Sequence, residues 1–454
     1  MGRRVKGRLS TFLDRIRSSY WFVPAVMSLM AVVLSTVLLS LDRRYADRIP
    51  SDVWWLYDGG DEGARVVLSA IATSMISVTS VVFSITIVAL TLAAGQFGSR
   101  VLRNFMRDRG NQVTLGTFIA TFVYAMLVLR SVRGLNDAEF VPPLAMSMGI
   151  LLVFVSVGIL IYFIHHVASS IQADSVVRSI ARETEDAIER LFPGAIGEEN
   201  PEGDRPEAGR PGAASLPTRF DAEAKKVRAP RGDRVQVIDN DGLMDLAVEH
   251  DLVLRLWARP GDFVVHDGII AEVWKEGDME PGLLDEVRDF FVLGQSRSLQ
   301  QDAEFGILQL VEVAVRALST GVNDPFTATN CVDRISSLLC RLAGRAFPGA
   351  HRFDDEGNLR VVADTSSFGG LVDSGFNQIR QNAQGSVAVP LRMLEALESI
   401  GAQVRTHEQR LVLEQHATLV LQAGLSGDPP GPDRIDLERT YASALRVIHS
   451  GRAH

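Results

Sequence analysis

The chain contains almost no cysteine and no cluster of metal-binding side chains. Only Cys331 and Cys340 occur among its 454 residues. Nine positions apart on a helix, they point to opposite faces because each residue turns the chain by about 100°, so no disulfide is expected between them. No Cys and His residues have the spacing of a zinc site. The sequence therefore predicts no metal and no cofactor, and the two cysteines suit a reducing cytoplasm.

The chain also lacks a strongly basic domain and a recognisable catalytic motif. Its net charge is −9, and without a basic domain we expect no nucleic-acid partner. The sequence contains no phosphate-binding loop, no metal-binding cluster and no nucleophile paired with a base. We therefore expect a protein that is not an enzyme.

Long apolar segments, in contrast, fill the first third of the chain. They lie at about Trp21–Leu41, Val66–Ala94, Val113–Leu129 and Leu144–Ile164. Each is near or above the roughly 20 residues that a helix needs to cross a bilayer core of about 30 Å. The predicted fold class is an α-helical membrane protein, with four transmembrane helices followed by a cytoplasmic α+β region. Its first expected partner is the lipid bilayer.

The charged residues around these segments predict the topology. The N-terminal arm and the connection between the second and third segments are rich in Arg, whereas the other two connections are acidic or balanced. By the positive-inside rule, both termini lie in the cytoplasm of a multi-pass protein of the inner (plasma) membrane. No Asp, Glu, Lys, Arg or His lies deep inside a segment, which disfavours ion-coupled transport.

Hydroxyl side chains recur along the second segment, at a spacing that places them in one stripe of a helix. One interpretation is a pore lining, formed by several copies around an axis. The other is close packing of small residues between helices, with each hydroxyl bonded to a carbonyl one turn back. Packing is favoured because Ser and Thr are common at such contacts. The pore-lining candidates are Ser69, Thr73, Ser77, Ser80, Ser84 and Thr91, followed by Gln96 and Arg100 at the cytoplasmic end.

Composition and periodicity divide the rest of the chain. Apolar residues at helical spacing continue past the fourth segment, so we expect its helix to extend to about Pro193. A segment rich in Pro, Gly and charged residues follows and is expected to be flexible. The predicted parts are a basic N-terminal arm (1–20), a four-helix transmembrane domain (21–164), a cytoplasmic helical extension (165–193), a linker (194–234), a small β-rich module (235–278) and a mostly helical cytoplasmic domain (279–454).

The pattern within the last two parts predicts individual elements. In the β-rich module we expect strands at Val235–Asp239, Leu252–Trp257, a turn into a strand at Arg259–Val264, and Ile269–Trp274, with a short helix at Leu243–His250. In the helical domain, a turn of acidic residues and glycine predicts a hairpin over Arg352–Asp364. Three- and four-residue spacing predicts helices at Pro281–Leu293, Leu299–Leu318, Pro325–Arg345, Phe368–Gln384, Val387–Ile400, His407–Ala423 and Leu437–His449.

The most distinctive stretch of this half joins two predicted helices through a turn. Gly321 can end the first helix in a left-handed conformation, and Asn323 or Asp324 can cap the second. Polar residues on one face of the first helix could form a pocket beside the turn. The alternative, which we favour, is a well-capped helical hairpin with solvated or paired polar residues. The candidate ligand-binding residues are Asp302, Gln309, Arg316, Asn323, Asp324 and Thr327.

Five short segments carry a resemblance to a known family. They are Val82–Leu90, Gln96–Asp108, Phe163–His166, Arg259–Val264 and Gly321–Pro325. Together they resemble a bacterial family of predicted membrane proteins, domain of unknown function 2254, and the resemblance spans roughly residues 15–425. It implies the architecture described above and brings no established activity.

Three functions stay open at this point. The first is a homo-oligomeric, channel-like or solute-permeation protein with a cytoplasmic regulatory domain, which the hydroxyl stripe and its Arg-rich cytoplasmic end favour. The second is a membrane-anchored scaffold or sensor that binds a protein or a small ligand through its cytoplasmic domain. The third is a membrane-anchored enzyme acting in the region 302–329, which no catalytic motif supports.

Overall fold

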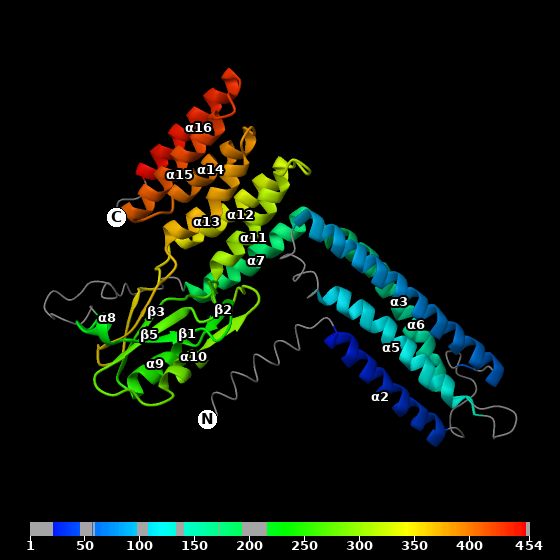
Figure 1. Cartoon of the computed structure of the whole chain (residues 1–454). Coiled ribbons are helices and arrows are strands. Elements are labelled where there is room, and N and C mark those ends of the chain that lie inside the picture. The colour runs from blue at the N-terminus through cyan, green and yellow to red at the C-terminus, as the bar shows by residue number, and fades with distance from the viewer. Residues whose placement is uncertain are drawn as a thin grey trace. The chain divides into compact units, whose positions relative to one another are not determined.

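A computed structural model of the chain describes residues 21–45, 57, 60–97, 108–132, 140–170, 172–192 and 216–450. These residues form two compact units, Met1–Val176 and Val177–His454. We call them the N-terminal unit and the C-terminal unit (Figure 1).

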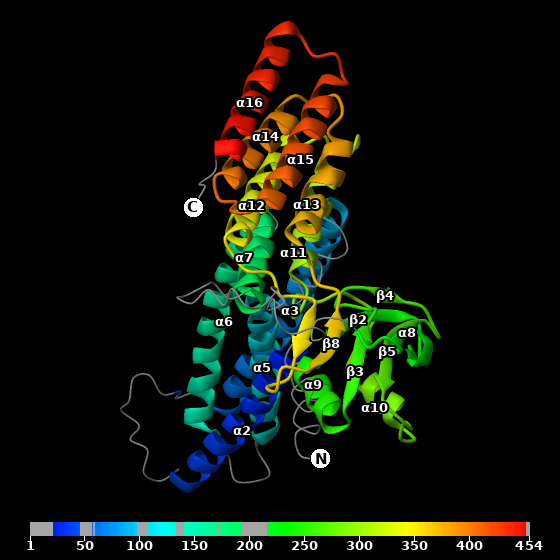
Figure 2. The same ribbon diagram turned by 90° about the vertical axis from the view of Figure 1, so that its left-hand side faces the viewer.

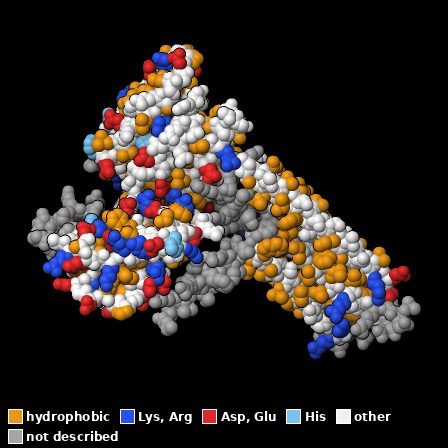
Figure 3. All heavy atoms as spheres, in the orientation of Figure 1, with side chains coloured by type: hydrophobic (Ala, Val, Ile, Leu, Met, Phe, Trp, Pro, Cys, Tyr) orange, Lys and Arg blue, Asp and Glu red, His pale blue; other side chains and the backbone are white. Residues whose placement is uncertain are grey.

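The N-terminal unit contains four helices that are long and apolar enough to cross a membrane, which confirms that part of the predicted fold class. α5 is the central helix, because 56% of its most apolar window is buried, compared with 17% for α2 and 22% each for α3 and α6. Figure 3 shows many hydrophobic side chains on the visible face of this unit. The four helices are α2 (Phe22–Tyr45), α3 (Asp61–Phe97), α5 (Arg109–Ser131) and α6 (Pro143–Ser170).

The interior of this unit is filled by large side chains. Phe118 and Tyr124 of α5 are buried, as are Leu68 of α3, Met146 of α6 and Phe163 of α6. They belong to one apolar cluster that all four helices share. Burial of this kind, rather than helix propensity, holds helices of such length together.

The fourth apolar segment does not continue as a single helix to Pro193. α6 ends at Ser170, and a separate helix, α7 (Ala173–Leu191), follows. Gln172 accepts the first hydrogen bonds of α7 through its carbonyl oxygen, from Ser175 and Val176. The prediction of one continuous helix was wrong because the apolar spacing persists across the short break.

The C-terminal unit contains two sheets (Figure 2). The first has the strand order β1-β5-β3-β8-β7 and the second β4-β2-β6. All neighbouring strands are antiparallel except β3 and β8, which pair in parallel. The strands are β1 (Lys225–Arg228), β2 (Asp233–Ile238), β3 (Leu252–Leu256), β4 (Phe263–Val264), β5 (Ile269–Lys275), β6 (Phe291–Gly294), β7 (His351–Phe353) and β8 (Leu359–Ala363).

The strands and the hairpin predicted in this region are confirmed, with two corrections. The predicted linker, 194–234, includes a short helix and β1, because Phe220 and Val227 are buried in the unit. The predicted helix Pro281–Leu293 is the short helix α10 followed by β6, which pairs with β2. Since β6, β7 and β8 join the earlier strands, the β-rich module and the helical domain form one unit. The short helices are α8 (Phe220–Glu223), α9 (Asn240–Glu249) and α10 (Leu283–Asp289).

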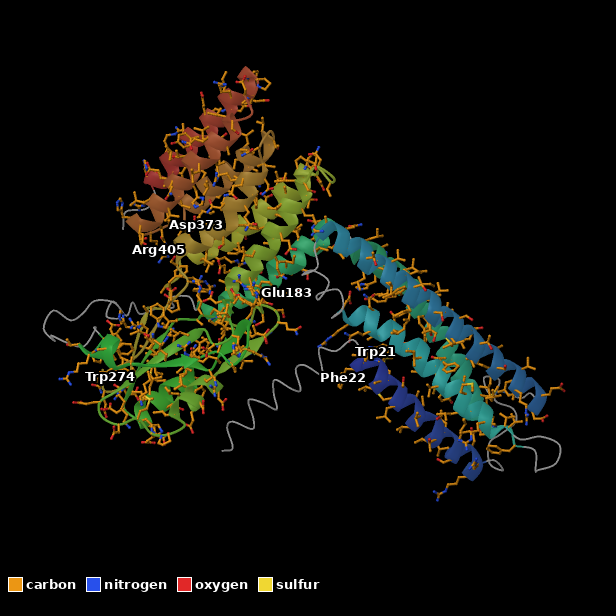
Figure 4. The ribbon with its side chains drawn as sticks, viewed as in Figure 1. Trp21, Phe22, Glu183, Trp274, Asp373 and Arg405 are labelled. Atoms are coloured by element: carbon orange, nitrogen blue, oxygen red, sulfur yellow. The ribbon has the colours of Figure 1, made fainter. Side chains whose placement is uncertain are left out.

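The remaining predicted helices are confirmed. α11 packs against α12 and α13, whereas α14 packs against α12, α15 and α16. A Cβ atom at Gly306 of α11 would clash with the side chain of Thr184, so α7 and α11 cross closely at this glycine. Asp373 of α13 is labelled in Figure 4, and its Oδ1 lies 3.1 Å from Nε2 of the buried His416 of α15. The helices are α11 (Ala303–Ala317), α12 (Pro325–Ala343), α13 (Phe368–Asn382), α14 (Ala388–Gly401), α15 (His407–Leu425) and α16 (Gly431–Ser450).

Candidate functional site

The hydroxyl stripe of α3 lies on the outside of the N-terminal unit. At about 100° per residue, its six members occupy about 80° of the helix circumference, and all six are exposed. The opposite side of α3 is buried against the other helices through Leu68, Met75 and Val82. Within the described residues of one chain, the stripe therefore packs against no other helix.

Four of the six stripe hydroxyls, those of Ser77, Ser80, Ser84 and Thr91, donate within α3 itself. Ser77 donates to the Thr73 carbonyl at 2.9 Å, and Ser84 donates to the Ser80 carbonyl at 2.9 Å. Thr91 makes the same bond to the carbonyl of Ile87 at 2.9 Å. These bonds lower the cost of placing hydroxyls in an apolar environment and leave their oxygen lone pairs free to accept. The side chains of Gln96 and Arg100 lie outside the described residues.

A second polar row, which the sequence analysis missed, lies buried along α5 and reaches α6 through Thr121 and Tyr124. Thr114 and Thr117 donate to carbonyls of their own helix, and the hydroxyl oxygens of Thr121 and Ser156 lie 3.2 Å apart. The hydroxyl of Tyr124 donates to the carbonyl of Ala145 at 2.8 Å. The spacing of the three threonines was visible in the sequence, but only the packing of α6 distinguishes this row from a lipid-facing one.

The row ends near Asp42, in the last turn of α2. Its two carboxylate oxygens accept hydrogen bonds from the amides of Leu144 and Ala145, at 3.1 and 3.0 Å. These amides belong to the first turn of α6 and have no partner within their own helix. Asp42 therefore caps α6 from a neighbouring helix and fixes the two helices together.

At the other end, Asp108 and His166 join α5 to α6. Asp108 caps α5 by accepting from the amide of Gly110 at 2.7 Å, and its other oxygen lies 2.6 Å from Nε2 of His166. A Cβ atom at Gly110 would lie 2.7 Å from the same ring nitrogen, so only glycine leaves room for the histidine. The next residue, Asn111, is 1% exposed, and neither amide atom of its side chain has a hydrogen-bond partner. Within the described residues, no hydrogen bond accounts for the buried position of the Asn111 side chain.

The charged site of the C-terminal unit is centred on Asp302 and Arg297. The Arg297 guanidinium donates to both carboxylate oxygens of Asp302, at 2.6 and 2.8 Å, and to Glu304 at 3.1 Å. Ser374 of α13 donates to the second oxygen of Glu304 at 2.6 Å. Asp302 also caps α11 by accepting from the amide of Phe305 at 3.1 Å. The network fixes the start of α11 to α13 and to the preceding loop.

The motif Arg259–Val264 meets this network at Gly261. Gly261 has a φ of 99°, which is a left-handed conformation, and a Cβ atom there would clash with the Asp302 carboxylate. Burial raises the pKa of Asp302, although Arg297 and the amide of Phe305 oppose this effect. The carboxylates are therefore engaged with protein donors, and the network is suited to holding elements in place.

The other residues of the predicted ligand pocket lie apart from Asp302. Arg316 follows it by 14 residues on one helix, which corresponds to about 21 Å at 1.5 Å per residue. Gln309, between them, is buried, and its side-chain oxygen has no hydrogen-bond partner. Asp302 and Arg316 therefore lie at opposite ends of α11, and the single pocket stays a prediction.

The turn after α11 is capped as predicted, with one difference. Asp324 caps α12 by accepting from the amide of Thr327 at 3.1 Å and the Thr327 hydroxyl at 2.5 Å. Asn323, with a φ of 48°, takes the left-handed conformation that we assigned to Gly321. Asn tolerates this conformation better than most residues with a side chain. Asn323 is exposed, and the turn is consistent with a structural role.

The fold defines a class of protein with four apolar helices that are able to span a membrane, followed by a mixed unit of helices and sheets. A family model described as "Predicted membrane protein (DUF2254)" matches residues 17–399, so the chain belongs to this family of predicted membrane proteins.

Relatives with similar sequences occur in mycobacteria. The chain is 29% identical over 450 residues to "Uncharacterized protein Mb1321c" of Mycobacterium bovis and to "Uncharacterized protein Rv1290c" of Mycobacterium tuberculosis. Each alignment covers 97% of this chain and 83% of the relative. No solved structure matches the chain.

Proposed function

We propose that the protein is a homo-oligomer in the inner membrane that works as a channel-like or solute-permeation protein, with the C-terminal unit as its cytoplasmic regulatory part. The observation that carries this proposal is the outward position of the whole hydroxyl stripe of α3. Exposed polar groups along an apolar helix gain most when a second copy or a water-filled path covers them. We propose that both termini lie in the cytoplasm, for which the distribution of Arg residues remains the support.

The filled interior of the N-terminal unit favours an assembly over a path through one chain. Phe118, Tyr124 and Phe163 occupy the centre of the unit, and the polar row along α5 is closed by its own hydrogen bonds. A path for a solute would then lie between copies, where α3 presents hydroxyl oxygens. The same surface also suits tight contact between copies, since Ser and Thr let helices approach closely.

Crosslinking of single cysteines in membranes tests the assembly. We expect Ser77→Cys and Ser84→Cys, each with Cys340→Ser, to form disulfide-linked dimers on oxidation. The matched control is Ile161→Cys on α6, which is 67% exposed on an apolar surface without a stripe. Absence of stripe-specific dimers, together with a monomer mass in mild detergent, would contradict the proposed assembly.

Ion flux from proteoliposomes tests permeation separately. We expect flux through the wild-type protein and a several-fold loss in Ser84→Leu, because leucine replaces the hydroxyl by an apolar group of larger volume. A crosslinked oligomer that passes no ion or small solute would contradict the permeation part and leave assembly intact.

The second candidate is a membrane-anchored scaffold or sensor, and the C-terminal unit provides the observation that favours it. Gln309 has a buried oxygen without a hydrogen-bond partner, so α11 is a place where a bound ligand or water would be stabilised. We propose no enzymatic activity, since Asp302 and Glu304 are engaged with Arg297 and Ser374. Recovery of a specific ligand with the purified wild-type protein, lost in Gln309→Leu, would favour the sensor over the channel.

A further inference from the structure

Basic residues are concentrated on one short part of the C-terminal unit. Residues 225–234 contain five basic residues and one acidic residue, in a chain whose net charge is −9. This segment forms β1, the following turn and the start of β2. β1 is an edge strand of the first sheet, whereas β2 is the central strand of the second. The charge of this segment differs in sign from that of the chain as a whole.

A second turn, between β4 and β5, lies beside the first. The amide of Ala229 donates to the carbonyl of Gly268 at 2.8 Å, and the amide of Asp267 donates to the carbonyl of Ala229 at 3.0 Å. Arg228 also bonds the carbonyl of Asp267 through its guanidinium at 2.7 Å. The two turns are thus held together by backbone and side-chain hydrogen bonds, and they form one surface.

Apolar side chains protrude from this surface next to the basic ones. Phe263 is 60% exposed and Val265 is 61% exposed, while Val264 between them is buried. Ile269 is also exposed and pairs in register with Arg228. The guanidinium of Arg234 lies 5.8 Å from the centre of the Phe263 ring. Neighbouring exposed apolar groups of this kind mark an interaction surface more often than single ones do.

Part of the positive charge on this surface is not neutralised within the protein. Arg228 pairs with Asp267 at 3.1 Å, and Arg231 pairs with Asp233 at 2.7 Å. Lys225, Lys226 and Arg234 form no ion pair with the described residues. Figure 3 shows basic and hydrophobic side chains close together over the sheet region. We call the surface formed by Lys225, Lys226, Arg228, Arg234, Phe263, Val265 and Ile269 the apolar–basic edge.

We propose that the apolar–basic edge docks on the anionic surface of a lipid bilayer. Protruding aromatic and aliphatic groups insert at the level of the headgroups, and neighbouring Lys and Arg residues attract anionic lipids. The unit is joined by chain to four helices that are able to span a membrane, so it experiences a high local concentration of bilayer. The inference rests on membrane insertion and does not depend on oligomerisation or permeation.

A fluorophore placed on the edge tests this docking in the full-length protein. Val265→Cys carries an environment-sensitive nitrobenzoxadiazole label, in a Cys340→Ser background, with Cys331 left in place because it is fully buried. The matched control is Ile435→Cys on α16, which has the same 61% exposure as Val265. Both proteins are reconstituted in nanodiscs of phosphatidylcholine with or without phosphatidylglycerol, and quenching by doxyl-labelled lipid is measured.

We expect quenching at position 265 to exceed that at position 435 several-fold in the anionic discs, and to fall to the control level in neutral discs. Lys225→Glu combined with Lys226→Glu should have the same effect as neutral discs, whereas Arg439→Glu on α16 should have none. Added salt should reduce the quenching at position 265 when Lys225 and Lys226 are unchanged, because salt screens the attraction between the basic residues and the anionic lipid. Three results would each overturn the proposal. They are equal quenching at the two positions, quenching that does not depend on anionic lipid, and a fluorescence shift without lipid quenching, which a protein partner would give.

Discussion

Replacing Arg297 by methionine tests whether the buried charge network stabilises the C-terminal unit. Methionine keeps much of the length of the side chain but donates no hydrogen bond. Glu304 retains Ser374 as a donor, whereas Asp302 retains only the amide of Phe305. The side chain of Asp302 is 4% exposed, so the substitution leaves a buried carboxylate without a cation.

The expected cost follows from this geometry. Removing one partner of a buried ion pair destabilises a protein by about 3–5 kcal/mol. Burial raises the pKa of Asp302 even with Arg297 beside it, and loss of the cation raises this pKa further. A group with a raised pKa in the folded state favours the protonated form, so stability is lost as the pH rises through that pKa. The Arg297→Met variant should therefore become more stable as the pH falls.

Hydrogen exchange of the α11 amides in the full-length protein measures the effect. A loss of about 3 kcal/mol speeds exchange through global opening of the unit by about two orders of magnitude, since each 1.4 kcal/mol is tenfold. The matched control is Arg439→Met, in which the replaced side chain is 72% exposed. Adding Asp302→Asn should recover part of the loss, because the amide is neutral and still accepts from Phe305. Equal exchange in the Arg297 and Arg439 variants, or strictly additive losses in the double variant, would refute the reasoning.

Two further predictions concern the same unit. Gly306→Ala should lower the free energy of unfolding by about 1–3 kcal/mol through overpacking against Thr184, and Thr184→Ala should restore part of it. Denaturant unfolding of the two single variants and the double variant measures these free energies. If Gly306→Ala lowers the free energy of unfolding equally with and without Thr184→Ala, the clash is excluded. Burial raises the pKa of Asp354, but the amide of Asn358 and the Arg360 guanidinium lower it more, to about 2. Because this pKa is lower in the folded protein, Asp354 stabilises the fold at any pH above its pKa in the unfolded chain. This contribution is lost as the pH falls from about 4 toward 2. Asp354→Asn should flatten the stability profile in that range, and an unchanged acid limb would contradict the assignment.

Features carried by local sequence could be predicted. The four apolar helices follow from uninterrupted runs of about 20 residues, and the caps at Asp302 and Asp324 follow from residue type at a helix start. The hairpin over β7 and β8 follows from its acidic turn with glycine. In each case the residues that determine the element lie within a few positions of it, so no knowledge of the rest of the fold is needed.

Features that depend on distant partners could not be predicted. β6 was assigned to a helix because its strand character comes from pairing with β2, about 55 residues earlier in the chain. β1 was assigned to a linker because Val227 contributes a single buried apolar residue to a segment that is otherwise polar. For the polar face of α11, the sequence left a pocket and a capped hairpin open, with the hairpin favoured, because periodicity shows which residues share a face and does not show which neighbours cover that face.

The two polar rows of the N-terminal unit show that residue spacing alone does not predict which side of a helix is buried. The hydroxyls of α3 and the threonines of α5 have similar spacing in the sequence. Those of α3 are exposed, whereas Thr114, Thr117 and Thr121 are buried, and Thr121 meets Ser156 of α6. The difference arises because α5 lies at the centre of the unit and α3 at its side. In the buried row, hydrogen bonds within and between helices satisfy the donors, so its contribution is to the stability of one chain. On α3, the hydroxyls of Ser77, Ser80, Ser84 and Thr91 donate within the helix. Any further hydrogen bond to their oxygens has to come from outside the single chain. A sequence stripe of this kind therefore indicates function only after the structure shows which side of the helix is already occupied.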